Sequence, residues 1–118
     1  MRFHILVLRG SVIAWTCAAV LGIAHAAGPD AATGAQISAQ CAACHGADGM
    51  SVDTIIPNLA GQHYQYLLAQ MNAFKQRTRS SPLMNELMRP MTEEQIKDVA
   101  AYYAGVQIQV KAVPKGRH

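Results

Sequence analysis

The sequence predicts a small all-α domain of about four helices. Apolar residues recur at i, i+3, i+4 and i+7 between residues 63 and 77, and a second stripe of helical spacing follows residue 92. No stretch shows the alternation of apolar and polar residues that is typical of a half-buried strand, and the sequence contains no internal repeat. We therefore expect helices that pack on one another around a single core.

Residues 1–26 have the features of a secretory signal peptide. Arg2 and Arg9 precede an uncharged apolar run from Ser11 to Ala24, and small residues flank a cleavage point after Ala26. This run of 14 residues is shorter than the roughly 20 that a helix needs to span a bilayer, so an uncleaved membrane anchor is the less favoured alternative. The pattern predicts export to the periplasm and a mature chain without a membrane span.

The mature segment predicted from this cleavage is one small domain, residues 27–105, with a loosely ordered tail at residues 106–118. Eight lysines and arginines stand against seven acidic residues from residue 27 onward, a net charge of +1, and nothing in this balance indicates nucleic-acid binding. A chain of this size buries little core by itself. A large apolar cofactor would therefore be a substantial part of its interior.

Residues 41–45 form a C-x-x-C-H motif, which predicts covalent attachment of one c-type haem. If the segment is helical, Cys41 and Cys44 lie on one face, where both sulfurs can reach the vinyl groups of one porphyrin. His45 can then bind the iron from the same side. A redox dithiol would require alternating strands and helices, and a zinc site would require four ligands, so both alternatives are disfavoured.

Capping and breaking residues set the helix boundaries. Pro82 follows two serines and should end the second helix, whereas Thr92 with Gln95 forms a capping pair for the last one. The expected elements are a helix from Asp30 or from the capping pair Thr33 and Gln36 through residue 45, a helix at 63–77, a loop or short helix at 83–89, and a helix from the cap Thr92 to Gly105.

Five methionines from residue 50 onward are candidates for the second axial ligand of the iron. Met50 follows the haem motif too closely to reach the opposite haem face, and Met71 belongs to an apolar helix stripe. Met91 directly precedes the last helix, where a hydrophobic staple is expected. Met84 and Met88 therefore remain as candidates.

Several segments together resemble the bacterial class I cytochromes c, in particular a single-haem half of the dihaem periplasmic kind. The similarity extends over nearly all of residues 31–105. It is carried by CAACHGADG at 41–49, by IPNLAGQ at 56–62, by Tyr66 and Gln70, and by AAYY at 100–103. The resemblance implies the small class I cytochrome c fold, with the first and last helices crossed and with Tyr102 or Tyr103 packed over Gly34.

The resemblance also implies site residues. The Pro57 carbonyl would accept a hydrogen bond from the second ring nitrogen of His45, which fixes the tautomer of a ligating histidine. The distal ligand would lie five residues after the basic residue Arg79, which is Met84, and Met88 is the alternative. These residues complete a candidate haem site in which Cys41, Cys44, His45, Pro57 and Met84 contact the cofactor.

An iron with histidine and methionine ligands has no open position, so the expected function is one-electron transfer and not catalysis such as peroxidase activity. Its partners would be redox proteins, a donor dehydrogenase or complex and an acceptor oxidase or reductase. The alternative is a haem c subunit of a membrane or periplasmic dehydrogenase or oxidase complex. Lys75, Arg77 and Arg79 form a dense cationic segment that is expected either to dock such partners or simply to end a helix.

Overall fold

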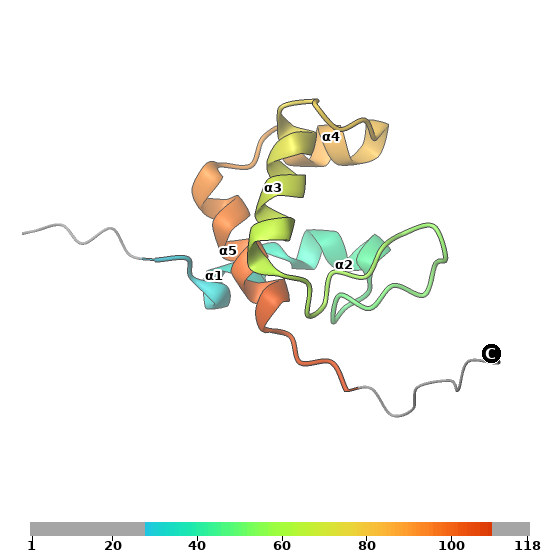
Figure 1. Ribbon diagram of the computed structural model, residues 1–118, viewed down its shortest axis with the longest axis vertical. Coiled ribbons are helices and arrows are strands. Elements are labelled where there is room, and N and C mark those ends of the chain that lie inside the picture. Colours follow the sequence, from blue (N-terminus) through green and yellow to red (C-terminus); the bar gives the residue numbers. More distant parts are fainter. Residues whose placement is uncertain (1–27, 110–118) are drawn as a thin grey trace, which may run out of the picture.

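The computed structural model describes residues 28–109 (Figure 1). The predicted signal peptide and residues 110–118 of the predicted tail lie outside the described residues. Within the described range the protein is all-helical, as the sequence predicts, and no helix in it is long and apolar enough to cross a membrane. The helices are α1 (Ala31–Ile37), α2 (Ala39–His45), α3 (Tyr64–Lys75), α4 (Pro82–Met88) and α5 (Glu93–Gly105).

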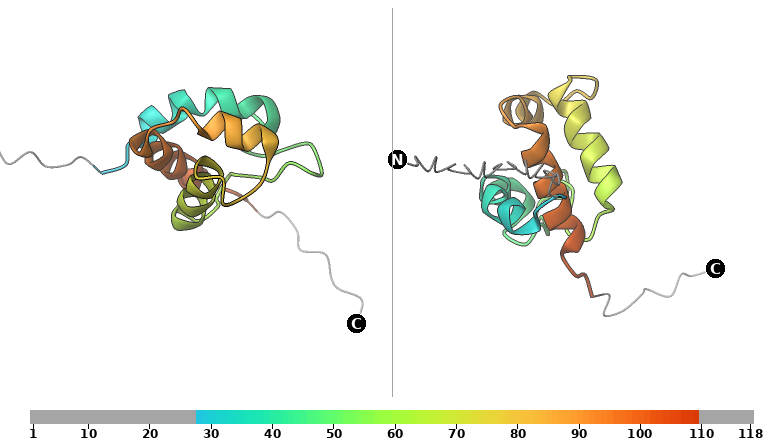
Figure 2. Two further views of the ribbon diagram at one scale, coloured as in Figure 1. Left: turned by 90° about the horizontal axis from the view of Figure 1, so that it is seen from above. Right: turned by 90° about the vertical axis from the view of Figure 1, so that its left-hand side faces the viewer.

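The helices enclose a core centred on α5. Helix α5 packs against α1 on one side and against α3 on the other, and α4 packs against the second half of α3 (Figures 1 and 2). A long irregular loop, residues 46–63, connects α2 to α3. The buried apolar residues come mainly from α3, α5 and the turn between α4 and α5, and they are Leu67, Phe74, Met88, Met91, Ile96, Val99, Ala100 and Tyr103.

The first expected helix is present as two consecutive helices. It begins at the earlier of the two predicted positions, because the Asp30 side chain accepts a hydrogen bond from the Ala32 amide at 2.9 Å and another from the Thr33 hydroxyl at 2.7 Å. Ser38 separates α1 from α2, and its hydroxyl donates to the Ala35 carbonyl at 2.7 Å. The haem motif occupies α2, so both cysteines lie on a helix as expected.

The first and last helices meet at Gly34, which confirms the predicted crossing. A Cβ atom at this position would lie only 2.0 Å from the Asp98 carbonyl oxygen and 3.0 Å from the Tyr102 Cβ atom. The residue over the glycine is therefore Tyr102, one of the two tyrosines that the sequence offered. A hydrogen bond of 2.7 Å from the Asp30 amide to the Asp98 carboxylate fastens the same crossing.

Helix α3 ends at Lys75, two residues before the predicted end. Arg77 adopts a positive φ of 59°, a conformation that ends a helix, although this residue is not glycine. The serine–proline segment then starts α4, because Ser81 is its N-cap and Pro82 is its first helical residue. The segment that was expected to be a loop or a short helix is therefore a helix.

Helix α5 has the predicted capping box. The Thr92 hydroxyl accepts from the Gln95 amide at 3.1 Å, and the Gln95 side chain accepts from the Thr92 amide at 2.9 Å. Met91 and Ile96, which flank this cap, are both buried in the core, as expected for a hydrophobic staple. The predicted end at Gly105 is also confirmed.

Candidate haem-attachment site

A cavity of about 390 Å³ lies between α2, α3 and α4 and is lined mostly by apolar side chains. Cys41, Cys44 and His45 all line it, so the structure brings the whole C-x-x-C-H motif to one wall. Cys41 is half-buried and Cys44 is exposed, and neither is part of a disulfide. Burial raises the pKa of the Cys41 thiol. The motif therefore presents two free thiols and one imidazole along a single edge of the cavity.

His45 is held in one orientation by a backbone group. It is buried, with 7% of its surface exposed, and its Nδ1 atom lies 2.8 Å from the Pro57 carbonyl oxygen. A carbonyl oxygen can only accept, so Nδ1 carries the hydrogen in this bond and Nε2 keeps its lone pair. This is the tautomer that a metal-binding histidine requires.

The loop after the motif brings Pro57 back to His45. Gly46 has a φ of 86°, and a Cβ atom there would lie 2.1 Å from the Met50 carbonyl oxygen, so only glycine fits this tight turn. Further along, the amides of Leu59 and Ala60 both donate to the Gly49 carbonyl oxygen, at 2.8 and 3.1 Å. The loop is therefore folded by its own backbone bonds.

Four of the candidate methionines line the cavity, namely Met71, Met84, Met88 and Met91. Met88 is only 3% exposed and belongs to the buried core, whereas Met84 is partly buried and packs against that core. The two lie one turn apart on α4, so they occupy the same side of that helix. Met50, which the sequence analysis set aside, is 40% exposed and does not line the cavity.

Asn85 is a structural residue of this region that sequence reasoning missed. Its buried amide donates to the carbonyl oxygens of Phe74 at 2.6 Å and Arg79 at 2.9 Å, and its oxygen accepts from the Ser81 amide at 2.9 Å. These three bonds tie the end of α3 to the start of α4, the helix that carries Met84. An asparagine within a short helix, between two methionines, was the available signal.

Tyr103 supplies an uncommitted polar group to the cavity wall. The residue is 1% exposed, and its hydroxyl is the one buried side-chain N or O atom in residues 28–109 without a hydrogen-bond partner. Burial raises the pKa of Tyr103 to about 12, and the neighbouring Cys41 thiolate adds to this shift. The phenol is thus a neutral donor. An apolar cavity with two thiols, an imidazole with a free lone pair and an uncommitted donor fits haem.

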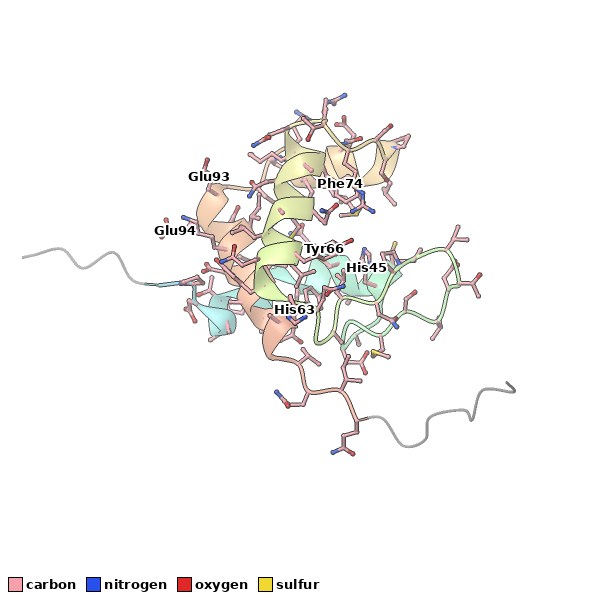
Figure 3. All side chains as sticks on the ribbon, viewed as in Figure 1. His45, His63, Tyr66, Phe74, Glu93 and Glu94 are labelled. Carbon is pink, nitrogen blue, oxygen red and sulfur yellow. The ribbon has the colours of Figure 1, made fainter. Side chains whose placement is uncertain are left out.

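Figure 3 shows how the walls meet: His45 projects from α2, and Tyr66 and Phe74 project from α3. All three line the cavity. In the part of the chain that the structure describes, no three His, Cys, Asp or Glu side chains cluster as a metal site.

The three cations that were considered for docking have different surroundings. The Lys75 ammonium donates to the backbone carbonyls of Arg89 and Met91, just before α5. Arg77 forms an exposed ion pair of 2.6 Å with Glu86. Arg79 lines the cavity. They therefore do not form one uniform surface patch.

Comparisons with known proteins agree with this geometry. The Cytochrome c family model matches residues 31–107. The chain is 45% identical over 89 residues to cytochrome c4 of Pseudomonas aeruginosa, an alignment that covers 75% of this chain and 44% of that relative. It is 46% identical over 70 residues to the thiosulfate dehydrogenase electron acceptor of Stutzerimonas stutzeri, covering 57% of this chain and 32% of that relative.

A solved structure of cytochrome c4 from Acidithiobacillus ferrooxidans superposes with a TM-score of 0.63 at 38% identity, covering 73% of this chain and 53% of that one. The chain spans less than half the length of the two curated relatives. The matched family segment contains all five helices and the complete cavity-lining motif. The chain therefore belongs to the cytochrome c family, whose members carry covalently attached haem c.

Proposed function

We propose that this chain is a periplasmic carrier of single electrons. It holds one haem c through Cys41 and Cys44, and its iron is bound by His45 and Met84. The observation that carries the proposal is the hydrogen bond between His45 Nδ1 and the Pro57 carbonyl oxygen, because it leaves Nε2 free as a ligand at the cavity wall. The bound haem supplies a redox-active iron, and the protein supplies its ligands and an apolar surrounding.

One haem is proposed because the sequence contains one C-x-x-C-H motif. The test is expression with the haem-attachment machinery in a bacterial periplasm, followed by intact-mass measurement of the purified protein. We expect one haem that acid and organic solvent do not extract, and loss of the signal peptide at residues 1–26. A protein that keeps two free thiols and no haem would contradict the proposal.

Met84 is proposed as the distal ligand because it lines the cavity and is only partly committed to the core. Met88 is 3% exposed and packs with the core residues, so it is better suited to support the wall. Met84→Ala should abolish the sulfur-to-iron charge-transfer band and lower the reduction potential, since a neutral thioether favours Fe(II). Met88→Ala should keep the band and cost about 2–5 kcal/mol of stability as a core truncation. The opposite spectral outcome would assign the ligand to Met88.

If His45 and Met84 both bind the iron, oxygen or peroxide would have no site on it. The resting protein should therefore reduce and oxidise reversibly by one electron without peroxidase turnover. Rapid peroxide consumption by the wild-type protein would contradict the proposal that both residues bind the iron.

Redox proteins are the proposed partners, and the edge formed by α3 and α4 is the proposed place of approach. This edge carries Lys75, Arg77, Arg79 and Arg89 against the single acid Glu86, so it keeps a positive charge after its two ion pairs. Arg77→Glu should slow electron transfer to an acidic partner at low ionic strength, and the difference should fade above about 0.1 M salt. Identical rates and salt dependence for variant and wild type would remove the docking role.

A second candidate function is that of a haem c subunit in a dehydrogenase or oxidase complex. The relative named thiosulfate dehydrogenase electron acceptor fits this candidate less well than it fits the carrier function, because its name describes a protein that accepts electrons. The observation that favours this candidate is exposed apolar surface: Val52 is 102% exposed, and Ile55 and Leu83, which line the cavity, are 86% and 58% exposed. Size-exclusion chromatography of the protein from its native periplasm separates the two functions, because a free carrier elutes as a small protein and a subunit elutes with its complex.

A further inference from the structure

Helix α4 carries both candidate distal ligands, Met84 and Met88, and it forms one wall of the cavity. Among residues 28–109, α4 packs against no helix except α3, whereas α5 packs against α1 as well as α3 (Figure 1). Met88 is its only buried apolar side chain, and Leu83 and Leu87 are exposed where they line the cavity. The position of α4 beside the cavity therefore depends on few contacts with the rest of the domain.

Two polar side chains hold α4 against the end of α3. Near the start of α4, the Asn85 amide bonds to the backbone at the end of α3 and in the turn that follows it. At the other end, the Lys75 ammonium donates to the carbonyl oxygen of Arg89, the C-cap residue of α4, at 3.1 Å and also to that of Met91. Lys75 is the last residue of α3, so its side chain joins the end of one helix to the end of the other.

The backbone that Lys75 reaches has few hydrogen bonds of its own. In the described part of the chain, no backbone N–H donates to the carbonyl oxygen of Arg89 or of Met91, and Pro90 between them has no N–H to offer. The last carbonyl groups of a helix carry a partial negative charge, so a cation is favourable there. Lys75 forms no ion pair with a carboxylate in residues 28–109. Its charge is therefore directed to the end of α4.

We propose that Lys75 is a positioning residue for the distal iron ligand, because its ammonium holds the end of α4 against α3 and so keeps a methionine of α4 on the iron. This inference deepens the proposed function and rests on it, since it requires a methionine of α4 as the ligand. A soft, neutral thioether favours Fe(II) over Fe(III). Retention of the methionine in the oxidised state therefore depends most on how firmly α4 is held.

The experiment measures how fast imidazole replaces the methionine in the purified ferric holoprotein. Stopped-flow absorbance follows the loss of the sulfur-to-iron charge-transfer band. Imidazole can bind only after the methionine has left the iron, so this rate reports the release of the ligand and not the stability of the whole fold. Lys75→Met removes two charge-assisted hydrogen bonds and keeps an unbranched apolar chain. We expect replacement to be about tenfold faster or more in this variant.

Further variants separate positioning of the ligand from the loss of a surface charge. Lys75→Arg keeps a cation with several N–H donors, so its rate should stay within about threefold of the wild-type rate. Lys97→Met removes an exposed lysine of α5 that does not line the cavity, and it should leave the rate unchanged. If Lys75→Met yields no holoprotein, Lys75→Gln replaces it, because its neutral amide forms weaker hydrogen bonds and should also speed replacement.

A replacement rate for the Lys75→Met or Lys75→Gln protein equal to that of Lys97→Met would overturn the inference. This holds even if the Lys75 variant unfolds at a lower guanidinium concentration, because Lys75 would then support the fold without holding the ligand. The carrier function would survive that result. A wild-type ferric holoprotein without the sulfur-to-iron charge-transfer band would instead overturn the proposed methionine ligand and the inference together.

Discussion

The crossing of α1 and α5 depends on the absence of a side chain at Gly34, so Gly34→Ala should open it. The added Cβ atom would lie 2.0 Å from the Asp98 carbonyl oxygen, whereas ordinary van der Waals contact begins at 3.4 Å. The helices must therefore separate by about 1.4 Å, the difference between these distances. A change of side-chain rotamer cannot relieve this clash, because the obstructing atom is the backbone carbonyl oxygen of Asp98.

The energetic cost follows from three terms. Overpacking costs about 1–3 kcal/mol, and separation also weakens the bond from the Asp30 amide to Asp98, which contributes about 1 kcal/mol. Alanine recovers about 1 kcal/mol of helix propensity relative to glycine. The net loss is about 2 kcal/mol, which lowers the melting temperature of a domain of this size by about 10 °C.

The assay is thermal and guanidinium unfolding of the holoproteins, followed by far-ultraviolet circular dichroism. Gly105→Ala is the control, because Gly105 also lies in a helix of this crossing but has no atom within 4 Å of the position its Cβ would take. That variant should be stabilised by about 0.4–1 kcal/mol. Equal midpoints for Gly34→Ala and Gly105→Ala would refute the steric reasoning.

Two further predictions concern Asn85, which supports α4, and Tyr103, which lines the cavity. Asn85→Ala leaves three backbone groups without their hydrogen-bond partner, so it should lower the free energy of unfolding, measured in guanidinium, by about 3 kcal/mol. A loss below about 1 kcal/mol would show that water replaces the Asn85 amide. Tyr103→Phe should change stability little at neutral pH, since the hydroxyl has no partner. Burial raises its pKa above the ordinary 10.0, so the wild type should lose stability relative to this variant as the pH rises above 10; parallel profiles would contradict that.

Local rules were sufficient for much of the fold. The capping box of Thr92 and Gln95 is a contact between residues three apart, and it forms as predicted. The apolar stripe of α5 and the end of that helix at Gly105 follow from the same short range. Such features depend on neighbours along the chain, so periodicity and capping preferences could locate them.

The rest depends on contacts between distant residues. The sequence could not separate Asp30 from Thr33 as the start of the first helix, because both residues can cap locally; the Asp30 cap is additionally held by the bond from its amide to Asp98, 68 residues away. Asn85 was missed although its three partners lie only 4 to 11 residues away, in the preceding turn and at the end of α3. A side chain that serves several backbone groups has no periodic signature.

The cations at 75, 77 and 79 show why charge density along a chain is a weak guide to a binding surface. Helix α3 ends at Lys75, so Arg77 and Arg79 both lie outside the helix. The positive φ of Arg77 turns the backbone before it reaches Arg79. Arg77 consequently points to Glu86, whereas Arg79 lies over Phe74 at the cavity. If both arginines served only docking, Arg77→Gln and Arg79→Gln would change the same observable, the salt-dependent transfer rate. Their different surroundings predict that the two variants change this rate by different amounts, and equal effects in stopped-flow measurements at low salt would contradict that expectation.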